Sequence, residues 1–446
     1  MSNSERKAGV CVVTTIALLV GVDHWLYGTR WFLRHFGYGT QEGQIVAKLD
    51  RAPLHASVAD VIFLGSSTIR ANIASRPFLD AGVLPLNLGI SGGGPIYDYY
   101  ALKSVADVLA RRSVKPLLVI ELSGLTLQPA PGTAWSEYEH LFSAVRSRQE
   151  LADDFPRLLA NFRSYHMTSV FLSGVILPST MYRSVSRSVG SLPLGEIPSM
   201  VTVGRGSNVA FYGFDDPWGF APLYGRAANA QPANAREIAS VVPAKREFLR
   251  ATLDLARRLG LDVVLLESSA TSEGRPPKSL FDELQGSVTG TRVIRFEDCD
   301  FHPEDFYDSH LNIWGAERLA TRLVRLLGLK GDRQSLDRKQ ALLLDRLPVP
   351  QPGSPFEVVP DVPHILEFEA APTAGKVCVS LGPTQSKWMP SYNATMACTP
   401  ENVEPAAAAR FYLRFRPRSP RAVVRITGEG AGGESSVRLV SFVRQR

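Results

Sequence analysis

The chain has 446 residues, 45% of them hydrophobic, and carries a formal net charge of +6 from 49 Lys and Arg against 43 Asp and Glu. This length exceeds one average domain, so two or three folded units are expected. The basic residues are interspersed with acidic ones rather than gathered in a block. This distribution excludes an evident nucleic-acid-binding surface and favours an ordinary solvated one.

Residues 1–34 are predicted to be a membrane anchor. Residues 8–22 are uncharged and mostly apolar, and they become just long enough to span a bilayer when extended to Tyr27. Because no small-residue cleavage site follows, an uncleaved signal anchor is favoured over a removed signal peptide. Arg6 and Lys7 before the apolar run favour a cytoplasmic N-terminus. The rest of the chain would then face an extracytoplasmic space.

Residues 35–346 are predicted to form an α/β domain. Apolar runs that end at turns indicate strands, and apolar residues at helical spacing indicate helices. Their alternation implies a parallel sheet with helices on both faces, which gives three layers. Besides a helix that follows a glycine-rich turn at 89–95, the predicted elements are strands at 58–64, 83–88, 117–121, 262–266 and 292–296 and helices at 71–81, 244–259 and 314–327.

An insertion at about 122–242 interrupts this alternation, with two or three helices predicted between 135 and 176 and a loop-like stretch at 203–235. A structureless stretch of this length is usually functional or poorly ordered. Within it, residues 211–224 mix aromatic side chains with two carboxylates. The mixture fits stacking on sugar rings with hydrogen bonds to their hydroxyls, and it fits equally a loop held in place by its own aromatic side chains. On the first interpretation, the substrate-binding candidates are Arg70, Tyr212, Asp215, Asp216 and Trp218.

The C-terminal part of the chain has a different pattern. A Pro-rich linker is predicted at 347–364 and a small accessory β-sandwich at 365–446, because about five short strands follow one another there. Cys378 and Cys398 in this region form either a disulfide, in an oxidising compartment, or two buried thiols. The four cysteines contain no C-x-x-C pair, which argues against a zinc or redox site. No metal or cofactor is expected.

The stretch 61–73 contains the strongest candidate for chemistry. Its apolar run ends at Leu64 and is followed by a turn with two serines, Ser66 and Ser67. A hydroxyl-rich turn at the carboxyl end of a strand is where open α/β sheets place ligand chemistry. Ser67, in preference to Ser66, is therefore a candidate nucleophile. The alternative is that the two serines serve only as a helix N-cap.

A serine nucleophile needs a base that accepts its proton. Of the eight histidines, His302 and His310 flank the last predicted strand of the sheet, where a loop can return to the carboxyl end of the first strand. His310 is preferred because its loop opens directly into the last predicted helix.

The order of a serine turn after the first strand and a histidine before the last helix resembles the SGNH (GDSL-like) hydrolase superfamily. It is most similar to the membrane-anchored branch that O-acetylates bacterial exopolysaccharides such as alginate, with D-alanyl transfer proteins as relatives. The similar blocks are residues 65–67, 87–94 and 308–315. The resemblance covers about 58–125 and 245–328, roughly a third of the chain.

The resemblance implies a flavodoxin-like fold for the α/β domain and roles for individual residues. Ser67 would be the nucleophile, His310 the base and Asp308 the carboxylate that orients His310, with Asp305 as an alternative to Asp308. The backbone N–H groups of Ser67 and Gly92 would bind the oxyanion.

Two features depart from the superfamily pattern. The usual Asp-x-x-His spacing is Asp-x-His here, which is the spacing of the alginate branch. The block Gly-x-Asn-Asp is absent, since residues 121–124 after the third predicted strand contain no asparagine. Either Ser123 replaces the missing oxyanion donor, or the backbone donors act alone.

The implied activity is acyl transfer, most simply of acetyl, to polysaccharide hydroxyls through an acyl-serine. The protein would sit in the bacterial inner membrane by one span, with its main domains in the periplasm, and a multi-span acyltransferase partner would supply the acyl group. Attack by water instead would give an esterase or deacetylase. A third interpretation, favoured by the missing block and the added β-sandwich, is a non-catalytic anchored scaffold or polysaccharide-binding protein.

Overall fold

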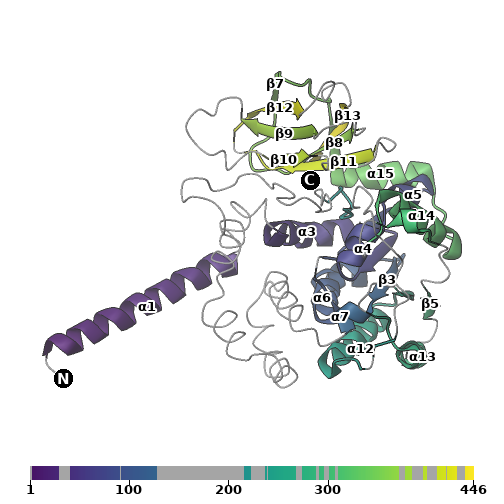
Figure 1. Cartoon of the computed structure of the whole chain (residues 1–446), viewed down its shortest axis with the longest axis horizontal. Coiled ribbons are helices and arrows are strands. Elements are labelled where there is room, and N and C mark those ends of the chain that lie inside the picture. The colour runs from purple at the N-terminus through teal and green to yellow at the C-terminus, as the bar shows by residue number, and fades with distance from the viewer. Residues whose placement is uncertain are drawn as a thin grey trace.

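The computed structural model describes residues 3–29, 41–90, 92–127, 215–221, 237–238, 240–267, 274–287, 291–295, 301–306, 310–370, 377–383, 395–398, 409–417, 419–428 and 437–446. Figure 1 shows the described elements, with the C-terminal β-strands at the top of the view and the helices of the α/β domain below them.

A five-stranded parallel sheet forms the centre of the α/β domain, with the strand order β2-β1-β3-β4-β5. This is the flavodoxin-like order. Every residue of β1 is buried, because apolar helices cover both faces of the sheet. The predicted α/β architecture is confirmed, and the strands are β1 (Val61–Leu64), β2 (Pro85–Asn87), β3 (Leu117–Leu122), β4 (Val263–Glu267) and β5 (Arg292–Ile294).

Successive residues of β1 belong to different hydrophobic cores, as the pleat of a strand requires. Ile62 packs with α3 (Gln41–Ala56), α6 (Pro95–Arg111), α12 (Pro243–Arg258) and α13 (Lys278–Ser287). Phe63 packs on the other side, with helices α4 (Ser67–Asn72), α5 (Arg76–Asp80), α14 (Ile313–Leu326) and α15 (Arg333–Leu343). Two short elements complete this part, α7 (Gly124–Leu127) and the 3-10 helix η3 (Pro303–Asp305).

Two segments of the α/β domain differ from the sequence-based expectation. The single helix predicted at 71–81 is two short helices, α4 and α5, and Pro77 in the first turn of α5 favours a new helix start. The segment before the first strand, in which no element could be placed from the sequence, contains α3, which buries Ile45 and Leu49 in the core. These side chains lie four residues apart, a helical spacing too short in extent to be recognised from sequence.

The C-terminal residues 344–446, called the β module below, contain two four-stranded antiparallel sheets with a shared core. The module begins earlier than predicted: β7 lies inside the expected linker, where it pairs with β12, and β6 pairs with β13. Such long-range pairing leaves no local signal. The strands are β6 (Leu344–Leu347), β7 (Pro355–Glu357), β8 (His364–Ala370), β9 (Val377–Pro383), β10 (Thr395–Cys398), β11 (Ala409–Phe415), β12 (Arg421–Gly428) and β13 (Val437–Gln445).

The cysteines of the β module meet across two strands. Cys378 on β9 lies opposite Cys398 on β10, and Cys378 is disulfide-bonded. Of the two interpretations of this region, the structure therefore favours the disulfide. Cys11 is a free, exposed cysteine in α1 (Asn3–Thr29).

The β module packs directly on the α/β domain. Ile313 and Trp314, at the start of α14, pack against the core of the module. Arg414 on β11 is buried and donates a hydrogen bond to the carbonyl oxygen of Asp216 (3.5 Å). Arg51 on α3 donates to the side chain of Gln445. The start of the helix that follows His310 is therefore supported from two domains.

The N-terminal segment predicted as an anchor is helical, as α1. Among the residues that the structure describes, no helix has the length and apolar character needed to cross a membrane.

Candidate active site

The turn after β1, residues 65–67, places two serines in different environments. Ser66 is the N-cap of α4: its hydroxyl accepts the Thr68 N–H (3.2 Å) and donates to Glu121 Oε2 (2.8 Å). Ser67 is the first residue of the helix and is partly exposed. The N-cap interpretation therefore holds for Ser66, and this leaves the hydroxyl of Ser67 available for another partner.

That partner is His310. Ser67 Oγ lies 2.9 Å from His310 Nε2, although the two residues are 243 positions apart in the chain. The next residue, Leu311, donates its N–H to Asn72 Oδ1 at the end of α4 (2.9 Å), and Asn312 caps the start of α14. The histidine loop is therefore fastened to the same helix that carries the serine.

The other histidine candidate lies elsewhere. His302 is exposed, and its backbone N–H donates to Asp305 Oδ2 (2.8 Å). The carboxylate of Asp305 also forms an ion pair with Arg318 (3.2 Å) and serves this loop rather than His310. Asp308, the carboxylate expected to orient His310, lies outside the described residues.

The glycine-rich turn that follows β2 lies against the serine turn through Ile90 and Gly93. The N–H of Ile90 donates to the carbonyl oxygen of Gly65 (3.1 Å), and a Cβ added to Gly93 would lie 2.9 Å from the same oxygen. Gly92 has a left-handed φ of 72°. The N–H of Ser67, in the first turn of α4, has no intrahelical acceptor. Both predicted oxyanion donors thus belong to turns that touch.

Two side chains at the end of β3 have defined contacts here. Ser123, considered as a replacement oxyanion donor, donates to Thr126 Oγ1 (3.0 Å) and accepts the Thr126 N–H, which makes it a cap of α7. Glu121 is buried and accepts both the N–H (2.7 Å) and the hydroxyl of Ser66. Gly65 has φ of 150°, and an added Cβ would lie 2.6 Å from Glu121 Cβ, so only glycine fits.

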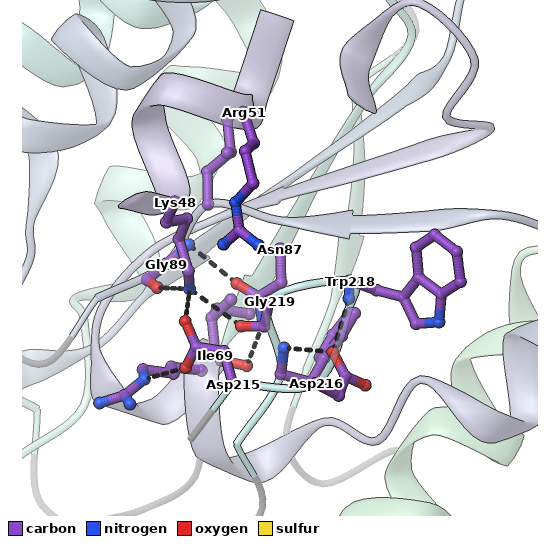
Figure 2. A network of polar contacts seen from close by, with 12 residues as sticks. Lys48, Arg51, Ile69, Asn87, Gly89, Asp215, Asp216, Trp218 and Gly219 are labelled. Atoms are coloured by element: carbon purple, nitrogen blue, oxygen red, sulfur yellow. Dashed lines mark hydrogen bonds and ion pairs between the residues drawn. The ribbon is translucent and has the colours of Figure 1, made fainter. Parts of the chain in front are cut away.

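The residues predicted to bind sugar lie mostly in a buried network beneath these turns. Asp215 Oδ1 accepts from Arg70 Nε (2.8 Å), and Asp215 Oδ2 pairs with Lys48 Nζ (3.2 Å). Asp216 Oδ1 accepts the N–H of Trp218 (2.8 Å), whose side chain is 4% exposed. Figure 2 shows these contacts around Lys48 and Asp215.

These contacts hold the loop in place, as the alternative expected, but they are made by its two carboxylates rather than by its aromatic side chains. The backbone of the loop 215–221 also bonds to a neighbouring strand, because the Trp218 carbonyl accepts the N–H of Asn87 (2.8 Å). Gly219 has φ of 95°, and an added Cβ would lie 2.3 Å from the carbonyl oxygen of Asn87, so only glycine fits. Tyr212 lies outside the described residues. Sugar binding by this set stays a prediction.

Burial shifts the protonation of this network. It lowers the pKa of Lys48 to about 8, although Asp215 opposes the change. It raises the pKa of Asp216 to about 6, against hydrogen bonds from Ser75 and from the N–H groups of Phe220 and Trp218. Burial also raises the pKa of Asp215, but Arg70, Lys48 and Arg414 outweigh it and hold that pKa below its ordinary value.

Sequence reasoning missed Lys48, Glu121 and Asn72. Lys48 lies in a segment without a recognised pattern, and Glu121 was noted only because it replaces an expected glycine block. A polar side chain at the end of a predicted strand or helix beside the serine turn was the available signal for Glu121 and Asn72. Nothing in the local sequence distinguishes Lys48.

The assembled site has a serine hydroxyl in contact with a histidine ring and two adjoining backbone turns at the carboxyl end of the sheet. This arrangement can support nucleophilic acyl transfer. Within the described residues, no cluster of His, Cys, Asp or Glu could hold a metal ion. A search of family models and of curated proteins found no match to this chain.

Proposed function

We propose that the protein is a serine acyltransferase of the SGNH type that transfers an acyl group, most simply acetyl, to hydroxyls of a cell-envelope or secreted polysaccharide. The observation that carries the proposal is the 2.9 Å contact between Ser67 Oγ and His310 Nε2. A hydroxyl within hydrogen-bond reach of an imidazole is what serine nucleophiles require. The polysaccharide acceptor rests on the resemblance to the exopolysaccharide O-acetylation branch.

In the proposed reaction, His310 Nε2 accepts the proton of Ser67 Oγ as this oxygen attacks the acyl carbonyl carbon. The N–H groups of Ser67 and Gly92 stabilise the negative oxygen of the tetrahedral intermediate. The intermediate collapses to acyl-Ser67, and His310 returns its proton to the leaving oxygen. A sugar hydroxyl then attacks acyl-Ser67 by the same steps in reverse order. Asp308 would fix the His310 tautomer and stabilise the imidazolium.

Hydrolysis is the second candidate, and one observation favours it. Ser67 and His310 are both partly exposed, so water reaches the acylated serine unless an acceptor covers it. The same residues would then form a carbohydrate esterase or deacetylase. The non-catalytic scaffold is disfavoured because a scaffold has no need for a serine and a histidine in contact across 243 residues.

The proposal also includes a location. The protein would be held in a bacterial inner membrane by its N-terminal segment, with the site in the periplasm and a multi-span acyltransferase partner as the source of acyl groups. Support comes from exposed apolar side chains on α1, which include Val10, Val12, Val13, Ile16 and Leu18. Such a surface is normally covered by lipid or by another chain.

A serine-directed fluorophosphonate probe tests the proposal. Wild-type chain should be labelled, Ser67→Ala should lose labelling, and His310→Gln should label at least about a hundredfold more slowly because the base is gone. Ser104→Ala is the matched control, since its hydroxyl bonds only the carbonyl of Ala101 on α6. Equal labelling of Ser67→Ala and wild type would refute a nucleophilic Ser67. Adding an oligosaccharide acceptor during turnover of an acetyl ester then distinguishes transfer from hydrolysis.

A further inference from the structure

Lys48 on α3 is a buried lysine with three oxygen partners. Its side chain is 4% exposed, and Nζ donates to the carbonyl oxygens of Gly89 (2.8 Å) and Gly219 (2.9 Å) and pairs with Asp215 Oδ2 (3.2 Å). An ammonium group has three N–H donors, so these partners match its full capacity. Figure 2 shows Nζ at the centre of the three contacts.

Backbone hydrogen bonds connect the contact between Lys48 and Gly89 to the turn that carries Ser67. The peptide between Gly89 and Ile90 accepts from Lys48 at its carbonyl and donates from its N–H to Gly65 O (3.1 Å). The next peptide, between Gly65 and Ser66, donates from its N–H to Glu121 Oε2 (2.7 Å). A chain of hydrogen-bonded peptides thus crosses both catalytic turns, with a buried cation at one end and a buried carboxylate at the other. Such chains polarise and rigidify one another.

A second connection reaches the nucleophile helix through Asp215. One carboxylate oxygen pairs with Lys48 and the other with Arg70 on α4, three residues after Ser67. Asn87 adds a third link, because its side chain accepts the N–H of Gly89 (2.8 Å) and donates to the carbonyl of Ile69 (2.9 Å). The position of the glycine turn relative to α4 therefore depends on groups that Lys48 holds together.

We propose, on the basis of the acyl-transfer function above, that Lys48 is a positioning residue whose ammonium group keeps the oxyanion-binding glycine turn aligned with Ser67. It does not touch the acyl group. Its effect is on the geometry of the N–H donors, and an error of about 1 Å in such geometry can cost about a hundredfold in rate.

This role predicts a rate that depends on the protonation of Lys48. The neutral amine has two donors and a lone pair, so one of the three contacts is lost and the lone pair opposes Asp215. The charged groups that act on Lys48 are Asp215 on its loop, Arg70 on α4 and Arg414 on β11. With a pKa of about 8, the ammonium is lost in mildly alkaline solution.

The same pKa predicts the opposite trend for stability. Because the folded pKa lies below the ordinary value of 10.5, the unfolded chain binds more protons between about pH 8 and about pH 10. The contribution of Lys48 to the free energy of unfolding therefore rises with pH in this window. A fall in the acylation rate in this pH window therefore cannot result from destabilisation of the fold by deprotonation of Lys48.

The test is the acylation rate of the full chain by p-nitrophenyl acetate between about pH 6 and about pH 10, with kcat and KM determined separately. We expect kcat of the wild type to fall above about pH 8 with KM little changed. Lys48→Met should be about a hundredfold slower and show no such fall. Lys48→Arg should recover part of the rate and move the alkaline fall upward, since guanidinium stays charged.

Lys339→Met is the matched control, because it removes a lysine ion pair with Asp60 at the opposite end of β1. Lys339→Met should acylate as fast as the wild type, and its rate should fall in alkaline solution as the wild-type rate does. Acylation that depends on Ser67 but shows no alkaline fall, or a Lys48→Met variant as fast as wild type, overturns the role of Lys48 alone. Equal ester turnover by wild type and Ser67→Ala overturns the acyl-transfer function as well. If Lys48→Met does not fold, the pH–rate profiles of wild type and Lys48→Arg test the proposed role of Lys48 instead.

Discussion

At the scale of single residues, the two neighbouring serines have different partners, and we propose a structural role for Ser66 and a chemical role for Ser67. Ser66→Ala removes an N-cap and a hydrogen bond to the buried Glu121, and it should lower the free energy of unfolding by about 1 to 3 kcal/mol. Ser67→Ala should change that free energy little and abolish acylation. Urea denaturation of both variants measures the first effect. A larger stability loss in Ser67→Ala than in Ser66→Ala would reverse the assignment.

Asp216 provides a pH-dependent prediction at the same scale. Its folded pKa of about 6 lies above the ordinary 3.8, so the stability it contributes is present at low pH and is lost as pH rises through about 6. Asp216→Asn keeps an oxygen for the N–H groups of Trp218 and Phe220. The advantage of wild type over this variant should therefore shrink by on the order of 2 to 3 kcal/mol between about pH 4 and about pH 7. An advantage that grows with pH would contradict the raised pKa.

Some residues of the site could be predicted from the sequence, and others could not. Ser67 and His310 were identifiable because a strand, a hydroxyl turn and a pre-helical histidine are local patterns, and the structure places their side chains in contact. Lys48 and Glu121 were not, because their importance comes from which distant carbonyls and N–H groups they meet. Arg70 and Asp215 were noticed as potential sugar ligands, although their contacts with each other are internal.

At the scale of elements, α14 connects the histidine loop to the β module. Trp314 at its start packs against the module core, four residues after His310. Trp314→Ala should lower the acylation rate about tenfold or more by loosening His310, and it should also destabilise the chain. Leu326→Ala, at the exposed end of the same helix, should change neither quantity measurably. Equal acylation by Trp314→Ala and wild type would remove the β module from the account of the site.

Secondary-structure elements could be predicted from the sequence where their pattern is local, and not where they depend on distant partners. The five strands of the parallel sheet were expected, since apolar runs between turns are sufficient to locate them. Strands β6 and β7 were missed because each is defined by pairing with β13 or β12, which lie far along the chain. α3 could not be placed from the sequence, because its buried face depends on the sheet that it covers.

At the scale of the whole molecule, the proposal places the site beside a membrane. The exposed apolar side chains of α1 should then be covered by lipid, so the full chain expressed in bacteria should sediment with membranes after an alkaline carbonate wash. Release into the supernatant, with α/β-domain stability unchanged, would contradict the anchor. It would leave the proposal for Ser67 untouched, because none of the site contacts given above, all between described residues, involves α1.

In the proposed mechanism, Ser67 forms an acyl-enzyme with His310 as its base. The most direct test of this mechanism is peptide mapping by mass spectrometry after brief exposure of the full chain to an activated acetyl ester and an acid quench. We expect one acetyl group on Ser67 in the wild type, and little or none in His310→Gln at the same time point. An acetyl group found only on lysines or on Ser66, or an unmodified Ser67 peptide in the folded wild type, would contradict this mechanism.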